Sequence, residues 1–265
     1  MTAQFREAEI REFWNKQAIE HLQSPAASWS DIRVIEMEIA AISSHLNDGD
    51  HVLDVGCANG FSSFQFATRR KVQLRGLDYI PRMIEEARRR VEQFSGKLKG
   101  SVEFDVGDIT DLPEKDEAYD KVVVIRVLIN LGNWDRQKRG MQECVRVLRR
   151  GGMLLLSEAT LQGWDRLNRL RAEWGLPDIP IPPFNEYLDQ EKVISELAGK
   201  MSLLEISNFA STYYVGTRVL KPLLSKTTKA PVDTADPNAE WNRWFSQLPA
   251  AGDYGTQKLF VFRKL

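Results

Sequence analysis

The chain has 265 residues, 43% of them hydrophobic and 28% charged, which is enough for a folded domain with its own core. Its formal net charge of -1 gives no general reason to expect a nucleic acid or an anionic membrane as partner. No apolar run approaches the roughly 20 residues of a membrane span. Two cysteines make no disulfide framework, and three histidines without ligand spacing predict no metal site. We therefore expect one cytoplasmic α/β domain, as a monomer or a homodimer.

Two helices are expected before the first strand. Residues 5–22 have a helical pattern, and residues 31–46 are amphipathic, with isoleucines at helical spacing after a capping Asp31. We expect residues 1–48 to form a helical cap on the core that follows.

Strands and helices then alternate along residues 49–160, which we take as the core. The predicted strands are 51–56, 72–79, 101–108, 121–128 and 152–159, and the predicted helices are 61–70, 81–94 and 133–150. The first, fourth and fifth strands are nearly continuous in Val, Ile and Leu, which is typical of a parallel sheet covered on both faces. This pattern predicts a doubly wound α/β fold, whose ligands bind beyond the carboxyl ends of the strands.

After residue 160 the pattern changes. Residues 161–190 are rich in Trp and Pro and predict an irregular cover, followed by a helix over 191–200. Two final strands are predicted over 202–210 and 257–265. The connection between them, residues 213–256, is long for a hairpin, which is typical of a lid or binding element. We expect residues 161–265 to cover the ligand side of the same domain.

The glycine turn GCANG, between Gly56 and Gly60, follows the first strand but lacks the G-x-G-x-x-G spacing of dinucleotide sites. Asp54 just before it would repel a pyrophosphate, so a cationic ligand group suits the turn better. Asp78, at the end of the second strand, can bind both hydroxyls of a ribose, and Asp108 can accept a hydrogen bond from an exocyclic amine. The three acids predict a nucleoside that carries positive charge and no phosphate.

In order and spacing, these segments resemble the class I S-adenosylmethionine-dependent methyltransferases. The matching segments are VLDVGCANG, GLDYIPRMIEEAR, FDVGDITDLP, YDKVVVIRVLINL and VLRRGGMLLLSEA. The resemblance covers about residues 30–160, with a weaker fit for the two final strands. It implies a Rossmann-like, mostly parallel sheet of seven strands, with S-adenosyl-L-methionine as cofactor.

The resemblance also implies roles for single residues. By this resemblance, Asp54 and the backbone of the turn bind the methionine end of the cofactor; the turn residues are Gly56, Cys57, Ala58 and Gly60. Asp78 binds the ribose hydroxyls. Tyr79 and Met83 line the ribose and adenine side, and Asp108 and Ile109 flank the adenine. Ala58 stands where the family usually has a middle glycine, and alanine disfavours a strongly positive φ. Each acid has a simpler interpretation too, as a turn or helix cap.

Candidate acceptor-side and catalytic residues lie near the ends of the fourth and fifth strands and in the segments added after them. Arg126 interrupts an apolar strand, so it is either a clamp for an anionic acceptor, in reach of the cofactor, or half of an internal salt bridge. Glu158 is a candidate general base, with a helix cap as the alternative. The other candidates are Asn130, Tyr213, Tyr214 and Arg218 for the acceptor, and Tyr214 for catalysis. Packing in the core is the alternative for both tyrosines.

We expect an enzyme that methylates a small polar or anionic acceptor, as an O-methylation of a metabolite or sugar derivative. Trp14, Trp29, Trp164 and Trp174 lie in segments that we expect to cover the pocket. One alternative is a non-catalytic S-adenosylmethionine-binding or interaction protein, because no obligatory base is visible. A nucleic-acid methyltransferase is a third possibility, but the chain shows neither a basic face nor the Asn/Asp-Pro-Pro-Tyr motif.

Overall fold

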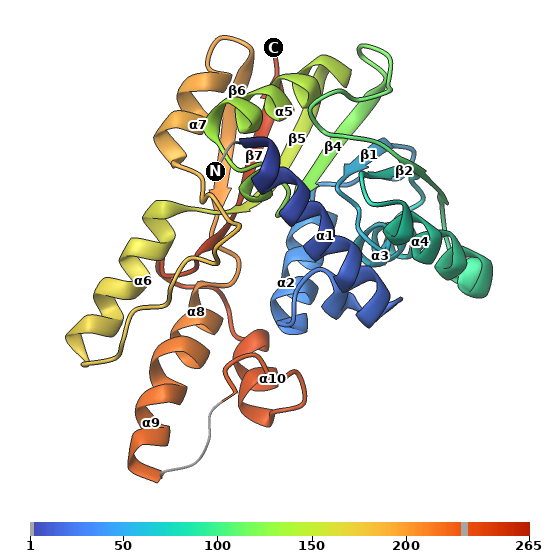
Figure 1. Cartoon of the computed structure of the whole chain (residues 1–265). Coiled ribbons are helices and arrows are strands. Elements are labelled where there is room, and N and C mark those ends of the chain that lie inside the picture. Colours follow the sequence, from blue (N-terminus) through green and yellow to red (C-terminus); the bar gives the residue numbers. More distant parts are fainter. Residues whose placement is uncertain (1–2, 229–232) are drawn as a thin grey trace.

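The computed structural model describes residues 3–228 and 233–265, with side chains for 7–227 and 233–265, and contains a seven-stranded sheet (Figure 1). The strands are β1 His51–Val55, β2 Gln73–Asp78, β3 Ser101–Val106, β4 Tyr119–Ile125, β5 Leu148–Ala159, β6 Met201–Ser207 and β7 Gln257–Lys264. Their order is β3-β2-β1-β4-β5-β7-β6. β1 to β5 pair in parallel, and β7 pairs antiparallel with both β5 and β6. The predicted doubly wound, mostly parallel fold is confirmed.

Helices cover both faces of this sheet. On one face lie α2 Ile32–Ser43, α3 Phe61–Arg69 and α4 Pro81–Phe94, and on the other lie α5 Trp134–Val147 and α7 Gln190–Leu197. Successive strand residues point to opposite faces, so Val52 packs against α2 and α3 while Leu53 and Val55 pack towards α5. This double covering explains the nearly continuous apolar strands.

β1 is the switch point of the sheet, because it pairs with β2 on one side and with β4 on the other. The chain runs from β1 towards β2 and from β4 towards β5, in opposite directions across the sheet, so the loops after β1 and β4 separate at the carboxyl edge. Short 3-10 turns follow several elements, namely η1 Pro25–Ala27, η2 Ser95–Lys97 and η3 Leu128–Asn130. The turn η3 lies directly after β4 and forms one wall of the switch point.

The first helix, α1 Ala3–His21, lies across the carboxyl ends of the strands (Figure 1). Ala18 of α1 and Ala27 of η1 are fully buried against Ile80 and Met83, at the start of α4. Small residues at this contact let the helix approach α4 closely. No helix among the described residues is long and apolar enough to cross a membrane.

Several local predictions were wrong, and β5 also begins four residues earlier than predicted, while α2 and β6 each end three residues earlier. Residues 161–190 were expected to be irregular, but they begin with α6 Leu161–Glu173, capped by the Thr160 side chain, which accepts from the Gly163 N–H. The cap places a helix ahead of the proline-rich stretch that dominated the pattern. β4 ends at Ile125 rather than at residue 128, so Arg126 follows the strand instead of interrupting it. α5 ends at Val147, three residues before the predicted end.

The long connection between the final strands contains helical segments separated by turns among the residues that the structure describes. Its elements are α8 Ser211–Tyr214, the π-helical η4 Val215–Leu220, α9 Lys221–Thr228 and α10 Glu240–Gln247. Tyr213 and Phe245 pack with Val34 of α2 and Leu167 of α6 in a core of their own. Figure 1 shows this group beyond the end of the sheet, next to α6. The connection is therefore packed against other helices.

Candidate active site

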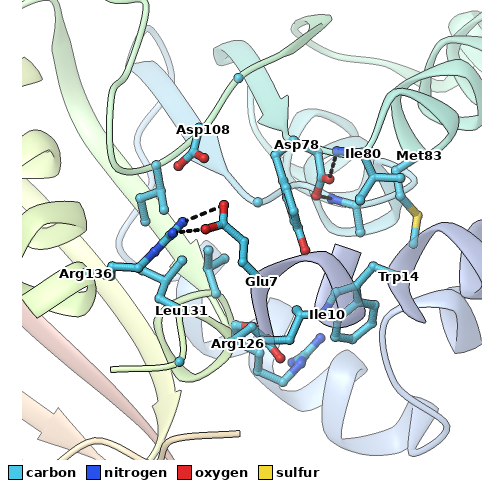
Figure 2. Close-up of a pocket in the computed structure, with 18 of the residues that line it drawn as sticks. Glu7, Ile10, Trp14, Asp78, Ile80, Met83, Asp108, Arg126, Leu131 and Arg136 are labelled. Atoms are coloured by element: carbon cyan, nitrogen blue, oxygen red, sulfur yellow. Dashed lines mark hydrogen bonds and ion pairs between the residues drawn. The ribbon is translucent and has the colours of Figure 1, made fainter. Parts of the chain in front are cut away.

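A cavity lies at the carboxyl ends of β1 to β4, under α1 (Figure 2). It encloses about 1040 Å³ of space, including the part that is open to solvent. A smaller cavity adjoins it, and the two share Ser28, Gly56, Ala58, Ile125 and Arg126 as lining residues. A concave site of this size at the switch point is where an α/β sheet binds a small molecule.

The glycine turn between the two cavities has a left-handed backbone at three positions. Gly56 has φ 74° and Gly60 has φ 70°. A Cβ on Gly56 would lie 2.2 Å from Val127 Cγ2, so no other residue fits there. Ala58 also has a positive φ, of 48°, which its alanine was expected to disfavour. That conformation costs about 1–2 kcal/mol in a non-glycine residue, and it directs the Ala58 N–H to Asp78.

Asp78 joins the turn to α4. Its Oδ2 accepts from the Ala58 N–H at 3.0 Å, and its Oδ1 accepts from the Ile80 N–H at 2.9 Å. Burial raises the pKa of this carboxyl to about 6, against the lowering effect of the two backbone hydrogen bonds. A carboxylate has about four acceptor positions, so two remain free for ligand hydroxyls. Asp78 is thus both a cap and part of the cavity wall.

The far wall of the larger cavity comes from the loop after β3. Asp108 Oδ1 accepts from the Thr110 N–H at 2.8 Å and from Thr110 Oγ at 2.7 Å, while Oδ2 remains for a ligand. Buried Ile109 and Met83 supply apolar surface on either side, and Tyr79 lies beside them. Figure 2 shows Asp78 and Asp108 on the same side of the cavity. A flat, apolar ring with an exocyclic amine suits this region.

Asp54 lines the smaller cavity and is only 1% exposed. Burial raises the pKa of its carboxyl to about 7, and the nearby charges of Asp78 and Glu38 add to the effect of burial. A hydrogen bond of 2.5 Å from Ser63 Oγ opposes it. A cation bound next to Asp54 would therefore favour the ionised form of its carboxyl.

Two predicted cofactor residues of the turn play lesser parts. Cys57 lines the smaller cavity, and burial raises the pKa of its thiol well above the ordinary value, so it is not a reactive thiolate. Gly60 lines neither cavity. It is the N-cap of α3, and a Cβ there would lie 2.6 Å from Phe104 Cζ. Its contribution to the site is the shape of the turn.

Arg126 lines both cavities, directly after β4, with a left-handed φ of 54°. Its Nη1 forms an ion pair with Glu38 of α2, and its Cζ lies 5.1 Å from the centroid of the Trp29 ring. Nη2 makes one long contact, 3.5 Å to Ser28 Oγ. Of the two interpretations of Arg126, the structure contains the internal salt bridge; the acceptor clamp stays a prediction.

Asn130 lies on η3 and lines the larger cavity. Its Nδ2 donates to the Arg126 carbonyl at 2.7 Å, and its Oδ1 accepts from Asn185 Nδ2 at 2.9 Å. The ring of Phe184, next to Asn185, lies 5.6 Å from that of Phe13 on α1. The segment after β5 therefore reaches the rim of the cavity at these two residues.

The structure argues against Glu158 as a general base. The side chain is fully buried and lines neither cavity. Its carboxylate accepts from the N–H groups of Val127 at 2.7 Å and Leu128 at 2.8 Å, with a longer contact of 3.5 Å to that of Ile129. Burial raises its pKa to about 8, against these donors. Glu158 caps the turn η3, which fits the alternative prediction of a cap.

Tyr213, Tyr214 and Arg218 are also placed away from both cavities. The Tyr213 hydroxyl donates to Asp31 Oδ1 at 3.0 Å, and Arg218 forms an ion pair with the same carboxylate. The Tyr214 hydroxyl accepts from Thr256 Oγ at 3.0 Å. Tyr213 and Arg218 instead fasten the connection between β6 and β7 to the N-cap of α2, and Tyr214 fastens it to the residue before β7.

Nothing in the sequence indicates that α1 lines the cavity with Glu7 and Ile10, although Trp14 was expected in a covering segment. Glu7 forms an ion pair with Arg136 of α5, with Nη2 3.2 Å from Oε1 (Figure 2). Of the other covering tryptophans, Trp29 stacks on Arg126, Trp164 donates to the Ile179 carbonyl, and Trp174 is exposed. Only the first of these three lies near the cavity.

Residues 46–176 match a family model described as a methyltransferase domain. Over these residues the chain is similar to methyltransferase domains, in agreement with the class I S-adenosylmethionine-dependent family that its sequence resembles. Among the residues that the structure describes, no cluster of three or more His, Cys, Asp or Glu side chains could hold a metal ion.

Curated relatives agree with this domain. Methyltransferase GfsG of Streptomyces halstedii is 30% identical over 161 residues, which cover 60% of this chain and 55% of that protein. O-methyltransferase resE of Aspergillus sclerotiorum is 33% identical over 113 residues, which cover 43% of this chain and 41% of that protein. The chain thus spans about half the length of the curated relatives it matches.

Solved structures show the same fold at low identity. A putative methyltransferase of Haloferax volcanii, in complex with the Trm112 activator, has a TM-score of 0.64 at 16% identity, over 95% of this chain and 97% of that one. Magnesium protoporphyrin IX methyltransferase of Synechocystis PCC 6803, with bound SAH, has a TM-score of 0.62 at 14% identity, over 97% and 99% of the two chains. The shared fold extends beyond the matched domain, to nearly the whole chain.

Proposed function

We propose that the protein transfers the methyl group of S-adenosylmethionine to a hydroxyl group of a small-molecule acceptor. The observation that supports it best is the pair of adjoining cavities at the switch point, with one carboxylate for each polar part of this cofactor. Asp78 and Asp108 line the larger cavity, and Asp54 with Arg126 lines the smaller one. A nucleoside fits the first pair, and a zwitterionic amino acid fits the second.

The residues present fit the cofactor part by part. Asp78 keeps two acceptor positions for the ribose hydroxyls, and Asp108 keeps one oxygen for the adenine amine, between Ile109 and Met83. The ionised form of Asp54 would hold the α-ammonium group, and the unused donors of Arg126 would hold the carboxylate. Gly56 keeps the turn in place between the two cavities, because a Cβ there would clash with Val127.

Bound S-adenosylmethionine supplies an activated methyl group. The chain's own contribution is to align an acceptor oxygen with that methyl in a site shielded from water, which can supply several kcal/mol of rate enhancement. Ile10, Trp14 and Leu131 give the larger cavity an apolar wall for this purpose. Since Glu158 lies outside it, we assign no general base among the predicted residues. A phenol has a pKa of about 10, far below that of an alcohol, so its proton can pass to solvent water as the methyl group is transferred.

Two features favour a neutral acceptor over an anionic one. Arg126 is paired with Glu38, and Arg136 is paired with Glu7, so both arginines of the cavity wall already have a carboxylate partner. The O-methyltransferase names of relatives, such as resE and 27-O-demethylrifamycin SV methyltransferase, support oxygen as the methylated atom. The net charge of -1 supports a small molecule rather than a nucleic acid. A cytoplasmic location and a monomeric or homodimeric state stay predictions.

The test combines binding and turnover. Calorimetry with S-adenosylhomocysteine should show a single site, and S-adenosylmethionine with a labelled methyl group should label neutral phenols and alcohols in a panel that also contains matched carboxylic acids. Labelling of amines alone would contradict O-methylation. Tight cofactor binding without labelling across a broad panel would favour the non-catalytic binding protein. A chain that does not bind S-adenosylhomocysteine would refute the proposal altogether.

A further inference from the structure

Glu38, in the middle of α2, has a carboxylate that is completely buried beside the cofactor cavities. It forms the ion pair with Arg126, it accepts from Ser157 Oγ of β5, and it accepts from Gln257 Nε2 of β7 at 3.1 Å. One side chain of the amino-terminal cap thus binds groups from three separate parts of the sheet. No motif in the sequence singles it out.

Stability alone does not account for this arrangement. A buried ion pair is on average no better for stability than apolar residues of similar volume, because both charges lose their hydration. Arg126 also has a left-handed backbone, which adds a cost of about 1–2 kcal/mol. A strained backbone and a buried charge at the edge of a ligand cavity indicate a functional constraint on where the guanidinium lies.

The same helix offers a pair for comparison. Asp31, the N-cap of α2, is fully buried and forms an ion pair with Arg218. Arg218 lines neither cavity, and its Cζ lies 5.5 Å and 5.0 Å from the ring centroids of Tyr213 and Tyr214. The Arg218 pair is enclosed by protein, whereas Arg126 lines both cavities and keeps donors that Glu38 does not use.

We propose that Glu38 is a positioning residue for the amino-acid end of the methyl donor, acting through Arg126. Glu38 holds Nη1, and this leaves Nη2 and Nε of Arg126 to bind the α-carboxylate of the ligand where the two cavities meet. The idea rests on the function proposed above and extends it to α2, which touches no part of the ligand itself.

Charge explains why the anchor is needed. Arg126 lies close enough to Asp54 for its positive charge to favour the ionised form of that acid. Without Glu38, Asp54 would be the nearest buried anion left in the smaller cavity, and Arg126 would turn towards it. That contact would occupy the carboxylate meant for the α-ammonium group. Glu38 therefore keeps the cation and the anion of the smaller cavity apart, as a zwitterionic ligand requires.

The test compares two ligands that share a nucleoside. S-adenosylhomocysteine has the amino-acid end, and 5′-methylthioadenosine lacks it. In Glu38→Gln, calorimetry should show an affinity for S-adenosylhomocysteine lowered about tenfold, with the affinity for 5′-methylthioadenosine unchanged. Asp31→Asn is the matched control, because it breaks the other buried pair of α2. It should lower the melting temperature and leave the ratio of the two affinities as in the wild type.

An unchanged ratio in Glu38→Gln, or an equal loss for both ligands, would overturn the proposal while leaving the cofactor site standing. A wild-type protein that binds neither ligand would overturn both. If Glu38→Gln does not fold, Ser157→Ala carries the test, because it removes one of the two neutral donors to the Glu38 carboxylate and leaves the other, Gln257, in place. We expect about a threefold selective loss for S-adenosylhomocysteine there. A ratio equal to that of the wild type would refute the role of Glu38.

Discussion

Replacing Asp78 with alanine should remove most of the affinity for S-adenosylhomocysteine. In the proposed function the carboxylate accepts from both ribose hydroxyls, and hydrogen bonds to a charged group contribute about 1.5–3 kcal/mol each. Both oxygens already accept a backbone N–H, from Ala58 at 3.0 Å and from Ile80 at 2.9 Å. We therefore take the lower end of the range, a total of about 3 kcal/mol, which is about 150-fold in the dissociation constant.

Calorimetry can separate this direct effect from damage to the turn. Alanine also leaves two N–H groups without an acceptor, so a lower melting temperature is expected whatever Asp78 binds. The 2′,3′-dideoxy analogue of S-adenosylhomocysteine completes a double-mutant cycle. The wild type should bind the analogue far more weakly than the parent ligand, and Asp78→Ala should bind both equally. A variant that still distinguishes the two ligands as the wild type does would refute the ribose assignment.

Variants at three further positions test the remaining geometry. Glu158→Gln keeps an oxygen for the Val127 and Leu128 N–H groups, so it should retain turnover. Glu158→Ala leaves both groups without an acceptor and should lower the free energy of unfolding by roughly 2–4 kcal/mol in chemical denaturation. A large loss of turnover in a folded Glu158→Gln would instead support Glu158 as the general base. Since the pKa of Asp54 is about 7 and only its ionised form attracts an ammonium group, affinity for S-adenosylhomocysteine should rise between pH 6 and pH 8, and a flat calorimetric profile would contradict this. In the ligand-free protein the same raised pKa makes the free energy of unfolding fall from about pH 4 to pH 7, because the unfolded chain binds fewer protons there. Asp54→Asn should lose the pH dependence of the affinity and should make this fall less steep, while the raised pKa values of Asp78 and Glu158 maintain the rest of it. Ala58→Gly relieves a φ of 48° and should raise the unfolding free energy by up to about 1 kcal/mol, while a clear drop would mean that the methyl group's packing near Met83 dominates.

The sheet and the nucleoside side of the site could be predicted from the sequence because their signals are local. Each strand carries its own apolar run, and each parallel strand ends at the same edge, so acids that follow β1, β2 and β3 meet there without any knowledge of packing. Asp78 and Asp108 are both cavity residues for this reason. The order of the strands was also predictable, since it follows from the family that the spacing resembles.

The acceptor side could not be predicted in the same way, because its residues meet only through packing. Glu158 lies at the end of a strand just as Asp78 does, but its carboxylate caps η3 and does not line the cavity. Arg126 was predicted to interrupt β4, yet it begins the turn after the strand, where its partner is a glutamate 88 residues earlier in the chain. No pattern within either segment encodes that pairing.

The length of a loop is a weak guide to what it covers, as the connection between β6 and β7 shows. A long connection was expected to form a lid, but its buried residues face α2 and α6, where Asp31 meets Arg218 and Tyr213. α2 thus carries two buried acids with different roles. Its N-cap fastens the connection to the domain, and Glu38, two turns further along, fastens Arg126 at the cofactor cavities. Because Asp31 and Glu38 lie on separate turns of this helix and bind different arginines, loss of the Asp31 pair should cost stability alone, whereas loss of the Glu38 pair should change binding in the smaller cavity.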